Sequence, residues 1–155
     1  MIRLTVFVLA LTLAACGKAT LPEASEAERP SRIVSLDFCA DQYLLKFADP
    51  EQILAVSPDA VREFSFRRAE AAGVPTVRPL AEDVILLKPD LVVRSYGGGP
   101  NAGAFFERAG IPVLQVGWAS SIHGDDISSI PKITRDVAAG LGHGDRGEAL
   151  VQSYQ

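Results

Sequence analysis

Four side chains that could contact a ligand follow short apolar runs of the sequence, and three of them are aromatic: Phe38, Arg94, Tyr96 and Trp118. Aromatic rings beside a few polar groups form shallow pockets that hold bulky, partly apolar ligands. Core packing is the alternative for any single ring, but three rings at equivalent positions favour a shared binding surface. The pattern therefore predicts a ligand-binding site, with Arg94 as its one cation.

Groups that support catalysis or hold a metal are scarce. His123 and His143 each lack a second ligand at metal spacing, whereas a zinc or manganese site needs several converging His, Asp or Glu side chains. We therefore interpret both histidines as solvated loop residues. Neither a Gly-x-Ser-x-Gly elbow nor a Cys/His pair is evident. We expect no enzymatic activity, no metal site and no cofactor.

Two glycine-rich segments raise the question of nucleotide binding. Residues 142–147 match G-x-G-x-x-G but follow a predicted helix, where the dinucleotide mechanism fails. Residues 97–102 fit the looser G-x-G-x-x-A form after a predicted strand. That strand is the fourth, however, and residues 117–118 stand where an acidic ribose partner is needed. The alternative function is an extracytoplasmic α/β nucleotide-binding protein or enzyme that uses Gly97, Gly98 and Gly99.

Strands and helices alternate along the chain and would position these residues. Apolar runs predict strands over 32–36, 53–56, 76–77, 91–93 and 113–116, and the intervening segments predict helices over 41–47, 61–72, 82–87, 101–109, 126–141 and 146–155. Residues 72–77 and 109–114 share one plan, a glycine after a helix and then a proline before a strand. The alternation predicts an α/β fold, a doubly wound parallel sheet of about five strands with helices on both faces. Ligands bind at the carboxyl ends of such strands, where Arg94 and Tyr96 are expected.

The amino-terminal segment has the pattern of an export signal. Arg3 precedes an apolar run over 4–15, and Cys16 stands where this run ends. We interpret residues 1–15 as a signal peptide, Cys16 as a lipidation site and the polar residues 16–30 as a lipid-anchored tether. The alternative is an ordinary signal peptide with an incidental cysteine. Either way, we expect the protein in the periplasm or on the extracytoplasmic membrane surface.

The bulk composition describes one globular domain without a nucleic-acid partner. The chain has 155 residues, of which 48% are apolar and 22% charged, with a net charge of −4. Phosphate binding needs a basic face, and no cluster of lysine or arginine occurs. We divide the mature chain into a ligand-binding lobe over 31–142 and the start of an inter-lobe helix over 143–155.

Three motifs resemble the periplasmic solute-binding proteins of ABC importers, in the branch for iron-siderophores, heme and cobalamin. They are Arg-Ile-Val-Ser-Leu at 32–36, Glu-Asp-Val-Ile-Leu-Leu-Lys-Pro-Asp-Leu-Val-Val at 82–93 and Ala-Gly-Ile-Pro-Val at 109–113. The resemblance covers residues 32–155 and implies the N-terminal lobe of a monomeric two-lobe protein, its lobes joined by a rigid helix. Such a protein captures an iron complex or corrinoid and docks on permease subunits.

The resemblance also implies roles for individual residues. Glu82 corresponds to the carboxylate that docks on the permease, and the ligand-facing loops carry Phe38, Arg94, Tyr96 and Trp118. The sequence contains no second lobe, so a non-functional single-lobe fragment is a further alternative.

Overall fold

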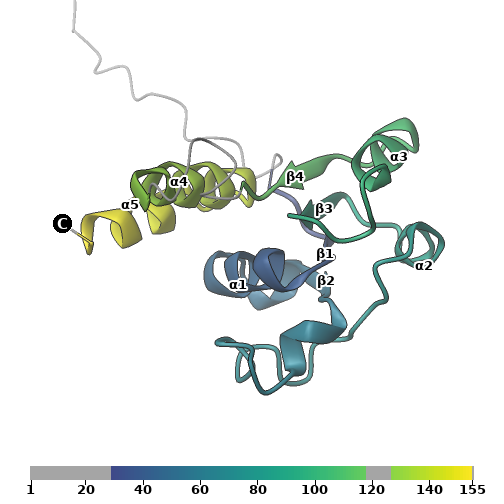
Figure 1. The fold of residues 1–155 in the computed structure, drawn as a ribbon, viewed down its shortest axis with the longest axis horizontal. Helices are drawn as coiled ribbons and strands as arrows, with labels where there is room; N and C mark the ends of the chain where they lie inside the picture. The colour runs from purple at the N-terminus through teal and green to yellow at the C-terminus, as the bar shows by residue number, and fades with distance from the viewer. Residues whose placement is uncertain (1–28, 118–126, 155) are drawn as a thin grey trace, which may run out of the picture.

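The computed structural model describes residues 29–117 and 127–154 (Figure 1). The predicted signal peptide, Cys16, nearly all of the predicted tether, His123 and Trp118 lie outside the described residues. In chain order the elements are β1 (Ile33–Ser35), α1 (Phe38–Phe47), η2 (Pro50–Gln52), β2 (Ile53–Ala55), η3 (Pro58–Val61), α2 (Ala81–Leu86), β3 (Leu91–Arg94), α3 (Ala102–Arg108), β4 (Val113–Gln115), η5 (Ile127–Ser129), α4 (Ile130–Gly140) and α5 (Gly144–Gln152).

The four strands form one parallel sheet in the order β2-β1-β3-β4. Ile33 in β1 pairs with Ile53 of β2 on one side and with Leu91 of β3 on the other. Both central strands are buried along their whole length, as parallel strands covered on two faces must be. The predicted fold class is therefore confirmed.

Helices cover both faces of the sheet, with α1, α4 and α5 on one side and α2 and α3 on the other (Figure 1). Successive strand residues point to opposite faces, so Ile33 packs with α1 and α4 while Val34 packs with α2 and α3. On the second face, Val84 of α2 and Phe106 of α3 are buried against the sheet. Burial of each such side chain contributes about 1.5–3 kcal/mol.

The described part of the chain departs from the sequence predictions in three places. The predicted strand at 76–77 is reduced to one parallel bridge between Val56 and Thr76, since Pro75 precedes it and a proline cannot donate to a ladder. Residues 62–72 form successive turns instead of the predicted helix. Two side chains two positions apart, such as Phe64 and Phe66, cannot share one helical face. Helix α1 begins at Phe38 rather than at residue 41, because Asp37 caps it.

At the amino edge of the sheet, Gln52 joins three segments of the chain. Its amide nitrogen donates to the carbonyls of Pro30 at 2.6 Å and Leu141 at 3.3 Å. Its amide oxygen accepts from the backbone N–H of Asp49 at 2.8 Å and lies 2.6 Å from Nε2 of His143. His143 is only 2% exposed, so its predicted place in a solvated loop is wrong. Burial, and after it the charge of Arg146, lower the pKa of His143, which favours the neutral ring.

A second amino-edge contact explains the Lys-Pro-Asp motif. The carboxylate of Asp90 accepts from the backbone N–H groups of Ser31 and Arg32 at 2.8 and 2.9 Å and from the Ser31 hydroxyl at 2.9 Å. Arg32 in turn donates to the carbonyls of Leu87 and Lys88. The motif therefore fixes the start of β3 beside the start of β1.

No helix in the described ranges is long and apolar enough to cross a membrane.

Candidate ligand-binding site at the carboxyl edge of the sheet

The strand order places a topological switch point between β1 and β3. The chain leaves β1 toward β2 on one side and later continues through β3 to β4 on the other. The loops that follow β1 and β3 therefore diverge at their carboxyl ends, which is where open α/β sheets bind ligands. This edge is the site predicted from the sequence.

A hollow of about 350 Å³ lies at this switch point. The segments after β1, β2 and β3 all contribute to its lining: Leu36, Asp37, Ser57, Pro58, Asp59, Pro79, Tyr96, Gly97 and Gly98. We call it the switch-point hollow. Of the three expected ligand-facing residues in the described part of the chain, Tyr96 lines it and Phe38 and Arg94 do not.

Asp37 holds the loop after β3 against the start of α1. Its Oδ2 atom accepts from three successive backbone N–H groups, those of Ser95 at 2.7 Å, Tyr96 at 3.0 Å and Gly97 at 2.9 Å. Its Oδ1 atom accepts from the N–H of Ala40 at 3.0 Å and caps α1. The side chain is 2% exposed, so these charge-assisted bonds replace its hydration.

Asp41, one helical turn further along α1, holds the loop after β2. Its carboxylate accepts from the N–H of Ser57 at 3.0 Å and from the Ser57 hydroxyl at 2.6 Å. The same hydroxyl accepts from the N–H of Asp59 at 3.1 Å. Burial raises the pKa of Asp41 to about 6, although the hydrogen bonds from Ser57 oppose this shift.

Arg94 is turned inward at the end of β3 and is 8% exposed. Its guanidinium donates to the carbonyls of Gly97 and Gly99, both at 2.9 Å, and to Oε1 of Gln115 at 3.2 Å. These contacts shape the glycine loop. The geometry therefore supports a structural role for Arg94, and its pairing with an anionic ligand group stays a prediction.

Gly97 lets this loop approach β1 closely. A Cβ atom at this position would lie 2.3 Å from the carbonyl oxygen of Leu36, far inside van der Waals contact. Gly98 and Gly99 adopt φ angles of 80° and 82°, in the left-handed region that glycine enters without strain. The three glycines are thus required by the backbone path around the hollow.

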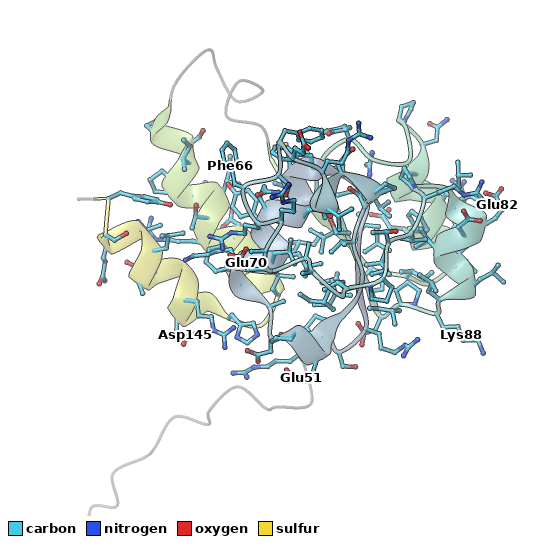
Figure 2. All side chains as sticks on the ribbon, turned by 90° about the horizontal axis from the view of Figure 1, so that it is seen from below. Glu51, Phe66, Glu70, Glu82, Lys88 and Asp145 are labelled. Atoms are coloured by element: carbon cyan, nitrogen blue, oxygen red, sulfur yellow. The ribbon has the colours of Figure 1, made fainter. Side chains whose placement is uncertain are left out.

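An aromatic patch formed by Phe38, Phe64 and Phe66 lies next to the loop after β1. The ring of Phe38 is 5.6 Å from that of Phe64 and 6.4 Å from that of Phe66. Phe64 is 54% and Phe66 89% exposed, and the guanidinium of Arg62 lies 5.6 Å from the Phe64 ring. Phe66 lies at the end of the molecule opposite Glu51 and Lys88 (Figure 2), which precede β2 and β3.

Tyr96 stands at the rim of the hollow with 49% of its surface exposed. Burial and the neighbouring carboxylate of Asp37 raise the pKa of its hydroxyl, so Tyr96 stays neutral. Burial and the charges of Asp37 and Asp41 also raise the pKa of the Cys39 thiol, and a protonated thiol is a poor nucleophile. Among the described residues, no group of three or more His, Cys, Asp or Glu could hold a metal ion.

Sequence reasoning missed Asp37, Asp41, Phe64 and Phe66 as site residues. Asp37 had a local signal, because it lies between a buried strand and a helix, where a side-chain cap is expected. A local signal also existed for Phe64 and Phe66, since these two aromatic residues alternate with polar residues in a charged segment. Asp41 had none, because its partner Ser57 is recognisable only after the chain has folded.

Glu82 is exposed in the first turn of α2. Figure 2 shows it at the side of the molecule away from Phe66 and Glu70. Two exposed leucines flank it, Leu80 at 48% and Leu86 at 79%. Glu82 is not among the residues that line the switch-point hollow, although Pro79, three residues before it, is.

The chain is similar to known proteins in its fold, but no similar sequence was found. No family model and no curated protein sequence matches the chain. Among solved structures, a periplasmic heme-binding protein from Pseudomonas aeruginosa aligns with a TM-score of 0.61 at 20% identity, over 81% of this chain and 43% of its own. The periplasmic heme-binding protein RhuT from Roseiflexus sp. RS-1 aligns with a TM-score of 0.61 at 25% identity, over 79% and 45%.

The periplasmic vitamin B12-binding protein BtuF of Vibrio cholerae aligns with a TM-score of 0.59 at 17% identity, over 81% of this chain and 47% of its own. The chain therefore spans less than half the length of each of these proteins. It has the α/β fold of one lobe of a periplasmic binding protein, so the resemblance found in the sequence is confirmed at the level of the fold.

Proposed function

We propose that the chain is a ligand-binding lobe of the extracytoplasmic solute-binding component of an ABC importer, which captures an iron-siderophore, heme or cobalamin-type ligand. One observation carries the proposal: exposed aromatic rings lie beside a hollow at the switch point, in a fold shared with heme- and B12-binding proteins. A contiguous patch of exposed phenylalanine rings is unfavourable in water and is typical of a surface that a ligand or partner covers.

The ligand would lie over Tyr96 and the aromatic patch, with its edge in the switch-point hollow. Phe38, Phe64 and Phe66 offer an apolar surface for a macrocycle or an aryl group, while the hollow offers the carboxylate of Asp59 and backbone groups. Trp118 follows β4 by three residues, and the proposal keeps its predicted role in ligand binding. Arg94 would act indirectly, by holding the glycine loop.

The nucleotide-binding alternative is less well supported by the geometry of the glycine loop. Phosphate binding requires free backbone N–H groups and a positive local field. At this loop, the N–H groups of Ser95, Tyr96 and Gly97 already donate to Asp37. A buried carboxylate there would also repel a phosphate.

The ligand proposal is tested by titrating the full-length protein with hemin, cyanocobalamin and a ferric hydroxamate siderophore. The chain has a single tryptophan, Trp118, which the proposal assigns to ligand binding, so its fluorescence should report on a bound ligand. A bound ligand should quench this fluorescence, and Phe66→Ala should weaken binding at least about tenfold. Absence of quenching by all three probes would contradict the proposal, and Glu51→Ala at the opposite end is the matched control.

We further propose that Glu82 docks on the permease and that Cys16 carries the lipid anchor, which would place the protein on the extracytoplasmic membrane surface. Glu82→Lys should stop uptake of the ligand and leave its affinity unchanged, because Glu82 is exposed on α2 and does not line the hollow. Glu70→Lys, also exposed, serves as the control. Uptake at the wild-type rate in Glu82→Lys would exclude this docking role. Metabolic labelling with palmitate tests whether Cys16 carries a lipid.

A further inference from the structure

The switch-point hollow has two walls that are held from one helix. Asp37 at the N-cap of α1 holds residues 95–97, and Asp41 within α1 holds Ser57. Both carboxylates are buried, at 2% and 0% exposure. The conformation of both walls is therefore fixed by contacts within the protein itself.

From this geometry, and resting on the proposed function, we propose that Asp37 is a positioning residue for ligand binding, which sets the turn after β3 and thereby places Tyr96 at the rim of the hollow. The turn is held from both sides. The carboxylate of Asp37 accepts hydrogen bonds from the N–H groups of residues 95–97. The guanidinium of Arg94 donates hydrogen bonds to the carbonyls of Gly97 and Gly99. Tyr96 is thus half exposed on a backbone that cannot rotate freely.

The arrangement requires a carboxylate specifically. Four N–H donors converge on the two oxygens of Asp37, three on Oδ2 and one on Oδ1. An asparagine has one acceptor oxygen, and its NH₂ group must face either the turn or Ala40. Since asparagine caps helices as well as aspartate does, its oxygen can stay on Ala40, and its NH₂ group would then face the N–H groups of the turn.

The chain contains its own control at the opposite edge of the sheet. Asp90 also accepts three hydrogen bonds that join β1 to β3, from the N–H and hydroxyl of Ser31 and the N–H of Arg32. It lies at the amino edge, where Lys88 marks the end of the molecule away from Phe66 (Figure 2). Asp90→Asn therefore perturbs a second carboxylate clamp, one that is exposed to solvent, without touching the hollow.

The first test uses amide hydrogen exchange in the ligand-free, full-length protein. In Asp37→Asn the amides of Ser95, Tyr96 and Gly97 should exchange at least about tenfold faster than in wild type, because each loses a charge-assisted acceptor. The Ala40 amide should stay protected, since the introduced asparagine side chain still caps α1. In Asp90→Asn the three turn amides should exchange as in wild type. Unchanged exchange of these amides in Asp37→Asn would overturn the proposal.

The second test measures affinity for hemin and cyanocobalamin at a temperature where every variant is fully folded. Asp37→Asn should bind whichever probe the wild type binds at least about tenfold more weakly, and Asp90→Asn within about twofold. Equal losses in both variants would show a general effect on the fold and would overturn the positioning role. If the wild type binds neither probe and does not bind the ferric hydroxamate siderophore, the proposed function loses its support, and the exchange experiment alone decides whether Asp37 places Tyr96.

Discussion

Asp41 should make the stability of this protein depend on pH in an unusual direction. Burial raises the pKa of its carboxyl from 3.8 to about 6, which corresponds to about 3 kcal/mol at most. The folded state therefore favours the protonated form. The contribution of Asp41 is fully present below pH 3.8 and is lost as the pH rises through about 6, the reverse of an ordinary paired carboxylate.

The perturbation that isolates this contribution is Asp41→Asn, which removes the titrating group and keeps its size. The pKa values of other carboxyl groups are lowered in the folded state. Burial raises the pKa of Asp90, for example, but hydrogen bonds from Ser31 and Arg32 outweigh burial and lower it. The quantity to measure is therefore the difference in free energy of unfolding between variant and wild type. Between pH 4 and pH 8 this difference should move in favour of Asp41→Asn by up to about 3 kcal/mol.

Urea denaturation followed by circular dichroism across this pH range provides the assay. Ser57→Ala supplies a second check, because its hydroxyl donates to Asp41 at 2.6 Å and favours the ionised form. Removal of this hydroxyl should move the pH midpoint of the effect upward. Parallel stability curves for Asp41→Asn and wild type would refute the reasoning.

Three further substitutions test the construction of the site. Gly97→Ala should destabilise the fold by about 1–3 kcal/mol in urea denaturation, since its Cβ would lie 2.3 Å from the Leu36 carbonyl oxygen; wild-type stability would mean that the loop can move away. Phe66→Ala should change stability by less than about 0.5 kcal/mol, because the ring is 89% exposed, and a larger loss would show that the ring packs in the fold. Arg94→Met should lower the melting temperature by removing about 2 kcal/mol or more of charged hydrogen bonds to Gly97 and Gly99, whereas an unchanged temperature would point back to a ligand-pairing role.

The local signals in the sequence predicted the framework of the fold well. The two hexads contain Gly73 and Gly110, and both glycines adopt left-handed φ angles, of 85° and 76°, although turns rather than a helix precede Gly73. Apolar runs predicted the four strands to within two residues at either end. These features depend on neighbours in the chain, so a single sequence carries them.

The site was predicted less well because its contacts are distant in the sequence. The place of Asp37 between a strand and a helix is a signal for the cap on α1, but its other three partners lie 58–60 residues away, and no local pattern indicates them. Arg94 was expected to face a ligand because it follows a strand. The positive φ angles of Gly98 and Gly99 bring backbone carbonyls within its reach, and these backbone contacts are not visible in a one-dimensional pattern.

The Gln52 contact at the amino edge has a mechanical consequence. A pull on the chain ahead of Pro30 acts first on the Gln52 amide and on the Ser31–Asp90 hydrogen bonds. Strand β1 lies behind them in the middle of the sheet, paired on both sides, so it must shear past two neighbours at once and cannot peel from an edge. The molecule thus resists traction at the end opposite the hollow, and these contacts take the load before it reaches Asp37 and the loop that Asp37 holds.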